Sequence, residues 1–283
     1  MSQADFWVPL NAHTASRSEP LWYWLPGWSF TATIFEPLLA ALPGRHLGLD
    51  YRAFYQCLTQ SGQTPTFNDA VTLLRQTASA DALWVGWSLG GALAHATLSH
   101  DRLSHDIQSQ AAAGTTSRIQ PRALCTLATG SRFLRQSDTS QQGMDEATFS
   151  AFRNGFERFP AKTLKRFLAL CCQGAEQPRA CIAALSSQQL TDQYAPLLAT
   201  SLDWLTQYQL DDHQLNNQHA DILRLAWYGQ HDALHPAGLT SSAALSTIPS
   251  CGSSHALLLE QATIPLLQRA LLELINASAG KQP

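Results

Sequence analysis

The sequence predicts an α/β fold in which helices flank a mostly parallel central sheet. Short apolar segments alternate along the first half of the chain with segments of helical spacing, which is typical of a parallel sheet covered on both faces. Apolar residues make up 45% of the 283 residues, enough for a large core, and charged residues make up only 14%. The formal net charge of −3 argues against a nucleic-acid binder or a polybasic membrane protein.

Three strands and two helices are expected before residue 100. The apolar run 21–25 stops at a proline and a glycine and predicts a buried strand, and 46–50 predicts a second one. Helical spacing of apolar residues over 66–78 is followed by a third apolar run at 82–87. An Ala- and Leu-rich helix over 89–98 then follows directly on that strand.

A long helical insert interrupts the predicted sheet. A fourth strand is expected at 123–128, after a polar segment at 101–121 that we interpret as an extended surface loop. Over 132–205 the strand signal vanishes and helical spacing takes over, which predicts a cap or lid. The sheet resumes at 222–229, with a weaker strand near 244–249.

These elements divide the chain into two predicted units. Residues 1–130 and 206–283 would form the α/β core, and residues 131–205 a helical cap inserted after the fourth predicted strand. His255 is expected to open the last apolar helix, which runs through Leu257 and Leu274.

The cysteines and the first residues bear on the compartment. The six cysteines form no CxxC pair and no metal-ligand spacing, so we interpret them as reduced, buried thiols. Residues 1–20 lack the basic and apolar regions of a signal peptide, and no apolar run approaches the ~20 residues that span a bilayer. We expect a cytoplasmic protein that needs no metal or organic cofactor.

A serine lies where the third predicted strand meets the following helix. Residues 86–91 are Gly-Trp-Ser-Leu-Gly-Gly, which fits the G-x-S-x-G nucleophile elbow. Gly86 and Gly90 leave room for a sharp turn that would lift the Ser88 hydroxyl above the sheet and aim the Leu89 N–H at a developing oxyanion. The alternative is an ordinary Gly-rich turn between a strand and a helix.

A serine nucleophile needs a base, and the elbow requires the chain order serine, acid, histidine. Among ten histidines His255 has the required position, because it follows the last predicted strand in a loop of Gly and Ser. Asp232 follows the strand that ends at Gly229 and would accept the Nδ1 proton of His255. The alternatives are a helix N-cap role for Asp232 and, as fallback acids, Asp211 and Asp212.

A second oxyanion donor should come from the loop after the first predicted strand. In Pro-Gly-Trp-Ser at 26–29 the natural donor is the backbone N–H of Trp28. The Trp28 indole could line an acyl pocket. The alternative is that the ring only packs in the core.

These residues resemble the α/β-hydrolase superfamily and, within it, the BioH family of pimeloyl-[acyl-carrier protein] methyl ester esterases of biotin synthesis. The resemblance rests on Pro-Gly-Trp at 26–28, Trp-Val-Gly-Trp-Ser-Leu-Gly-Gly at 84–91, Arg-Phe-Leu-Ala-Leu at 166–170, and Tyr228-Gly229 with Asp232. Two departures are a proline at 26 where the family has histidine, and Tyr-Arg-Ala-Phe-Tyr at 51–55 in place of a Gly-rich turn.

The resemblance implies a catalytic triad, an oxyanion side, an acyl pocket in the cap and a basic surface that docks an acyl carrier protein. The corresponding residues are Ser88, Asp232 and His255; Trp28 and Leu89; Phe167, Leu168, Ala169, Leu170 and Cys171; and Lys162, Arg166 and Arg179. Between residues 150 and 185 six basic side chains stand against two acidic ones, which supports such a surface. A solvated helix face is the alternative.

The sequence therefore predicts a monomeric serine carboxylesterase that hydrolyses the methyl ester of pimeloyl-[acyl-carrier protein] through an acyl-enzyme. One alternative is a broad-specificity carboxylesterase for short acyl esters, which would use every catalytic residue in the same way. A C–C bond hydrolase and a non-catalytic binding protein on the same scaffold are further alternatives.

Overall fold

The structure is a computed structural model that describes residues 6–11, 19–79, 81–99, 122–135, 143–209, 222–234, 246–247 and 252–279. The predicted loop at 101–121, Cys251 and the fallback acids at 211 and 212 lie outside these residues. The described strands are β1 (Trp7–Pro9), β2 (Leu21–Leu25), β3 (Arg45–Leu49), β4 (Ala82–Trp87), β5 (Ala123–Leu127), β6 (Leu223–Trp227) and β7 (Ser246–Thr247).

Within the described ranges these strands form one sheet in the order β1-β3-β2-β4-β5-β6-β7. β1 pairs antiparallel with β3, and the other neighbouring pairs are parallel. Every residue of the central strands β4 and β5 is buried, as expected for parallel strands with helices on both faces. The predicted α/β fold class is confirmed.

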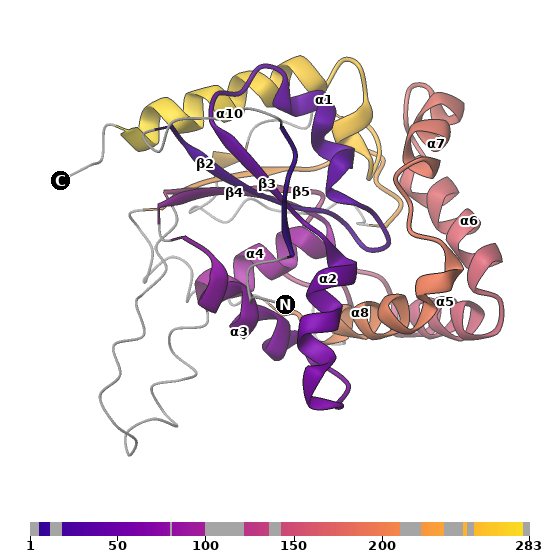
Figure 1. The fold of residues 1–283 in the computed structure, drawn as a ribbon. Helices are drawn as coiled ribbons and strands as arrows, with labels where there is room; N and C mark the ends of the chain where they lie inside the picture. Colours follow the sequence, from indigo (N-terminus) through magenta and orange to yellow (C-terminus); the bar gives the residue numbers. More distant parts are fainter. Residues whose placement is uncertain are drawn as a thin grey trace.

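The helices form a layer on each face of the sheet and a group at one end (Figure 1). They are α1 (Glu36–Leu39), α2 (Tyr51–Leu58), α3 (Phe67–Thr77), α4 (Leu89–Ser99), α5 (Glu146–Arg158), α6 (Pro160–Cys171), α7 (Pro178–Ser186), α8 (Ala195–Gln207) and α10 (Ile264–Ala279). α1 and α10 cover one face, and α3 and α4 cover the other, with α2 beside them (Figure 1). No helix in the described part of the chain is long and apolar enough to cross a membrane.

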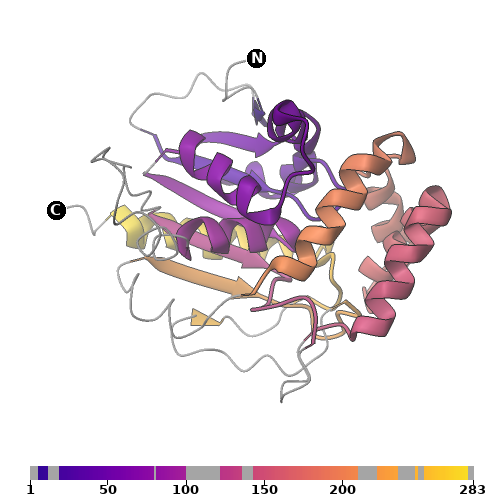
Figure 2. The ribbon, with the colours of Figure 1, turned by 90° about the horizontal axis from the view of Figure 1, so that it is seen from below.

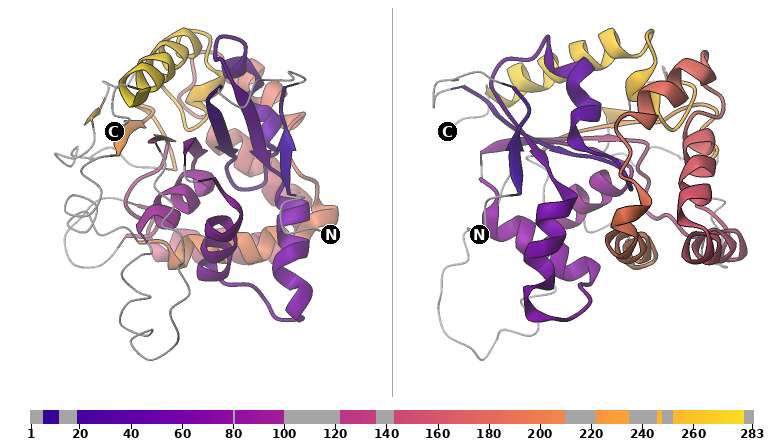
Figure 3. Two further views of the ribbon diagram at one scale, coloured as in Figure 1. Left: turned by 60° about the vertical axis from the view of Figure 1, so that its left-hand side comes forward. Right: turned by 45° about the vertical axis from the view of Figure 1, so that its right-hand side comes forward.

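The group at one end comprises α5, α6, α7 and α8, which come from the connection between β5 and β6. Figures 2 and 3 show these helices beyond the end of the sheet, with α8 next to the layer that contains α3. The helical insert after the fourth predicted strand is therefore present, and its helices overhang the edge where the parallel strands end. Loops at that edge are the usual place for a ligand site in an α/β sheet.

Two predicted boundaries are wrong. No strand is predicted before residue 21, whereas β1 pairs with β3 and buries Trp7 beside Phe6. Three residues are too few to show the alternating pattern of a strand. The last helix begins at Ile264 and not at His255, because a 3-10 turn at Leu257–Leu259 intervenes.

Two buried hydrogen bonds connect α4 in the core to Tyr208 at the end of α8 and to Gly130 after β5. His95 on α4 lies with its Nδ1 2.9 Å from the hydroxyl of Tyr208, and that hydroxyl donates to the carbonyl oxygen of Gly130 at 2.9 Å. Since the tyrosine hydrogen is used, His95 Nδ1 carries the proton in its bond to Tyr208. Burial and, to a smaller extent, the positive charge of Arg224 together lower the pKa of His95 to about 3.

This depressed pKa predicts acid lability at one site. In the unfolded chain His95 binds a proton below pH ~6.5, whereas in the folded protein it stays neutral until about pH 3. We therefore expect the free energy of unfolding to fall by about 1 kcal/mol for each pH unit below ~6 because of this group. His95→Asn should keep a donor near the Nδ1 position and remove the titration.

Urea unfolding between pH 7 and 4 checks this expectation. The His95→Asn variant should be less stable at pH 7, because the ring packing is lost, yet its stability should fall less steeply with pH than that of the wild type. If the free energy of unfolding fell equally steeply with pH in the two proteins, His95 would not couple folding to protonation.

Candidate active site

Ser88 occupies a strained turn between β4 and α4. Its φ is +54°, in the left-handed region that non-glycine residues seldom adopt. The Ser88 N–H donates to Leu127 O at 2.9 Å, and the Ser88 carbonyl accepts from the Thr129 hydroxyl at 3.0 Å. The end of β5 thus holds this turn from the neighbouring strand.

The glycines around Ser88 allow close approach of the backbone. A Cβ on Gly90 would lie 2.0 Å from Leu25 O, and one on Gly86 would lie 2.6 Å from Gly90 O. Both distances are far below van der Waals contact, so no larger residue fits without moving the backbone of the turn. The geometry is that of a nucleophile elbow, with a serine hydroxyl raised at the end of a central strand.

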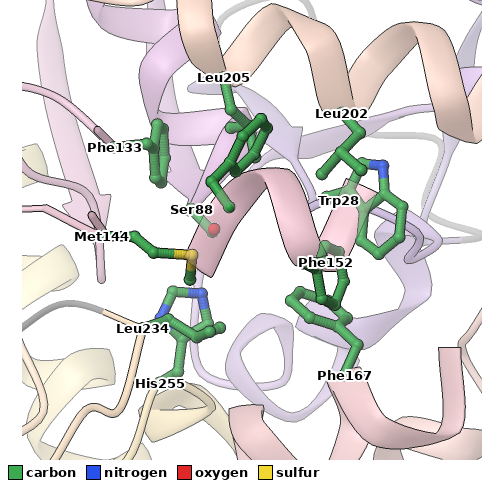
Figure 4. A pocket seen from close by; sticks show the side chains of 11 residues that line it. Trp28, Ser88, Phe133, Met144, Phe152, Phe167, Leu202, Leu205, Leu234 and His255 are labelled. Atoms are coloured by element: carbon green, nitrogen blue, oxygen red, sulfur yellow. The ribbon is translucent and has the colours of Figure 1, made fainter. Parts of the chain in front are cut away.

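His255 and Asp232 form a buried pair beside this serine. His255 Nδ1 lies 2.7 Å from Asp232 Oδ2, and both side chains are at least 98% buried. The other carboxylate oxygen of Asp232 accepts from the N–H of Leu234 at 2.9 Å. The second ring nitrogen of His255, Nε2, is buried with no hydrogen-bond partner among the described residues. The Ser88 hydroxyl and the His255 ring border the same cavity (Figure 4).

A second buried carboxylate holds the loop that carries His255. Glu260 accepts from the backbone N–H groups of Ser253 and Ser254 at 2.9 and 2.8 Å, and from the Ser254 hydroxyl at 2.6 Å. The Trp87 indole donates to the carbonyl oxygen of His255 at 2.8 Å. Sequence reasoning missed Glu260, because it assigned that region to a regular helix.

The loops of His255 and Asp232 run side by side. A bridge pairs Gly229 with Gly252, and the N–H of His231 donates to Ser253 O at 2.7 Å. The acid and the histidine are therefore positioned by hydrogen bonds between their own loops as well as by their contact.

The two backbone N–H groups predicted to bind an oxyanion belong to α4 and to the loop after β2. Leu89 is the first residue of α4, and the first N–H groups of a helix have no acceptor within the helix. Trp28 lies in the loop after β2, where its indole nitrogen donates to Leu198 O of α8 at 2.8 Å. The Tyr51 hydroxyl donates to Pro26 O at 2.8 Å in the same loop. Pro26 and Tyr51, two of the residues at which the chain departs from the family it resembles, thus contact each other.

The cavity above Ser88 has a volume of about 50 Å³ and is almost entirely apolar. It is lined by Trp28, Ser88, Phe133, Met144, Phe149, Phe152, Phe167, Leu202, Leu205, Leu234 and His255. Most of these side chains come from the helical insert and its flanking segments, and they point toward the serine (Figure 4). An uncharged chain of carbon atoms suits this lining, whereas a bare charge would lose its hydration there.

Two solved structures share this architecture. The bromoperoxidase of Bacillus anthracis matches with a TM-score of 0.68 at 16% identity, over 95% of this chain and 99% of that one. The haloalkane dehalogenase DbeA of Bradyrhizobium elkani matches with a TM-score of 0.63 at 19% identity, over 95% and 94%. The chain has the α/β-hydrolase fold.

Sequence comparison adds distant relatives within this fold. No family model matches the chain. A pimeloyl-[acyl-carrier protein] methyl ester esterase of Shewanella sp. is 31% identical over 180 residues, 62% of this chain and 59% of the relative. One of Vibrio cholerae is 30% identical over 165 residues, 58% and 57%. The match thus spans less than two thirds of the length of these curated relatives.

Of the predicted acyl-pocket residues on α6, only Phe167 lines this cavity. Each helical residue turns the side chain by about 100°, so consecutive positions cannot share one wall. Leu168 is buried but does not border the cavity, Ala169 is exposed and Leu170 is half-buried. Cys171 contacts the loop that carries His255, because its carbonyl oxygen accepts from the Ala256 N–H at 3.1 Å.

The remaining cavity wall was missed by sequence reasoning. The aromatic residues on α5 recur at 149, 152 and 156, a helical spacing that marks one buried face and could have indicated a wall. Phe133 and Met144 come from irregular chain before α5, which carries no periodic signal.

The three predicted docking residues are all exposed on helices of the insert. Lys162 and Arg166 are exposed on α6, and Arg179 is exposed on α7. Arg153 contributes less free charge to this surface, because its guanidinium binds Asp203 through two nitrogens, at 2.5 and 3.0 Å.

Proposed function

We propose that the chain is a serine carboxylesterase that hydrolyses the methyl ester of pimeloyl-[acyl-carrier protein], with Ser88, His255 and Asp232 as its triad. The observation that carries the proposal is the buried His255–Asp232 hydrogen bond of 2.7 Å, which borders the cavity of the elbow serine. In this fold that combination of nucleophile, base and acid performs acyl transfer.

The proposed reaction runs through an acyl-enzyme. Ser88 Oγ attacks the ester carbonyl while His255 Nε2 takes its proton, and the N–H groups of Leu89 and Trp28 bind the oxyanion. Asp232 keeps the Nδ1 proton on His255 and stabilises the imidazolium. His255 then protonates the departing methanol, and a water activated by the same nitrogen releases the free carboxylate.

Three features support the choice of substrate. The apolar cavity suits a hydrocarbon acyl chain, and the relatives that align over about 60% of the chain carry this activity in their names. Exposed basic residues on α6 and α7 would attract an acidic carrier protein to the insert. We propose that residues 131–205 act as a cap on a core of residues 1–130 and 206–283.

Charge reversal on the insert tests the carrier. We expect Lys162→Glu, Arg166→Glu and Arg179→Glu together to lower kcat/KM for the carrier-bound methyl ester at least about tenfold at low salt, because basic side chains that face an acidic partner raise the association rate. A short p-nitrophenyl ester should be hydrolysed as by the wild type. Arg269→Glu is the control, because Arg269 is also exposed but lies on α10, outside the insert.

A broad-specificity esterase for short acyl esters is the second candidate, and the small cavity volume of about 50 Å³ favours it. It predicts rapid hydrolysis of the short ester, little activity on the carrier-bound ester and equal rates in the charge-reversed and control variants. That result would reject the carrier-bound substrate and leave the triad in place.

A further inference from the structure

Two cysteines of the insert face each other outside the cavity. Cys172 follows the last residue of α6, Cys181 lies on α7, and their sulfur atoms are 2.8 Å apart, with the Cys172 thiol as the donor. Both are buried, and neither borders the cavity of Ser88. The esterase chemistry proposed above uses neither of them.

We propose that Cys172 and Cys181 are a site of reversible oxidation, where a peroxide converts the two thiols into a disulfide that joins α6 to α7. The Cys181 thiolate attacks one oxygen of hydrogen peroxide, the O–O bond breaks, and the other oxygen leaves as hydroxide, so that Cys181 becomes a sulfenic acid. The Cys172 sulfur then attacks the sulfenic sulfur, and water leaves. Two thiols and one peroxide thus give one disulfide and two waters.

The local hydrogen bond favours Cys181 as the first nucleophile. Donation from the Cys172 thiol lowers the pKa of Cys181, and a larger thiolate fraction reacts faster with peroxide. Cys125 shows the contrast, because burial in β5 raises the pKa of its thiol to about 12. The sulfur contact and the adjacency of the two helices carry the inference, and the pKa indicates the order of attack.

The turn between the two cysteines supports the catalytic loops. Gly174 has a φ of +86°, and a Cβ there would lie 2.5 Å from His231 Cβ and 3.3 Å from Ser253 O. The turn therefore packs against the loops of both Asp232 and His255. A disulfide between Cys172 and Cys181 would close this turn covalently, and neither cysteine borders the cavity.

A structural metal site is the other use of paired thiols, and the surroundings argue against it. Among the described residues no third histidine, cysteine, aspartate or glutamate completes a ligand group. Structural zinc is almost always held by four ligands.

Peptide mapping of the full chain after hydrogen peroxide treatment tests the proposal. Trypsin cleaves after Arg166 and Arg179, so the disulfide would link peptide 167–179 to the peptide that begins at Ala180. We expect this linked pair, lighter by two hydrogen atoms than the separate peptides, to appear with peroxide and to vanish with dithiothreitol. The oxidised protein should melt about 5 °C higher than the reduced one.

Three serine variants make the result specific. Cys172→Ser and Cys181→Ser should each abolish the link and the rise in Tm, whereas Cys57→Ser on α2 should preserve both. Three results would each overturn the proposal. The first is that the thiols of Cys172 and Cys181 stay free at a peroxide dose that already oxidises Cys57. The others are a sulfinic acid at Cys181 with no disulfide, and a disulfide that involves Cys171 instead. Mass and melting do not depend on esterase activity, so these outcomes are separate from the test of the proposed function.

Discussion

Replacing Ser88 with alanine is expected to lower kcat/KM for ester hydrolysis by a factor of about 10⁴ or more. The variant would keep its cavity and oxyanion donors and lose the only atom that forms the acyl-enzyme. Replacing His255 with alanine should cost about as much, and the Ser88→Ala/His255→Ala double variant should be hardly slower than either single variant, because nucleophile and base act as a unit. Steady-state kinetics on the short ester measures all three.

A second buried serine gives the matched control. Ser201 on α8 donates its hydroxyl to Leu197 O at 2.8 Å, and Ser201→Ala should hydrolyse esters nearly as fast as the wild type. An active-site serine probe should label the wild type and Ser201→Ala but not Ser88→Ala. Full activity in Ser88→Ala would exclude the proposed mechanism, and an unlabelled wild type would favour a non-catalytic binding protein.

The fold could be predicted where burial is continuous. β4 and β5 are buried on both faces, so their sequences are unbroken apolar runs with clear ends. β1 has only three residues at the sheet edge and is defined by its pairing with β3, which no local pattern reveals. The start of α10 was misplaced because Leu257–Leu259 is as apolar as a buried helix but forms a separate 3-10 turn that ends at Glu260.

Chain order indicated Ser88, Asp232 and His255 because loops that follow parallel strands meet at one edge of the sheet. The cavity wall depends instead on how four inserted helices pack over that edge. Arg-Phe-Leu-Ala-Leu at 166–170 could mark the helix, yet its rotation decides that Phe167 alone of the predicted 167–171 run lines the cavity. Motif spacing therefore indicates chemistry more readily than the shape of a pocket.

Glu260 should matter nearly as much as the triad, although it lies outside the cavity. Glu260→Ala would remove the acceptor of the buried Ser254 N–H and hydroxyl and of the partly buried Ser253 N–H. Each unsatisfied group costs about 1–3 kcal/mol, so the free energy of unfolding should fall by at least about 3 kcal/mol. The loop would then hold His255 less firmly, and kcat should fall about 10- to 100-fold.

Separate measurement of kcat and KM distinguishes a role of Glu260 in positioning His255 from a general loss of structure in the variant. Because Glu260 does not border the cavity, KM for the short ester should change little in the folded fraction, while kcat falls. Glu260→Gln should lie between, since its one amide oxygen replaces part of the acceptor set. Glu273→Gln, exposed on α10, should match the wild type in urea unfolding and in kinetics. An unchanged kcat in Glu260→Ala, with stability lowered, would mean that Trp87 and the paired loops hold His255 without the carboxylate.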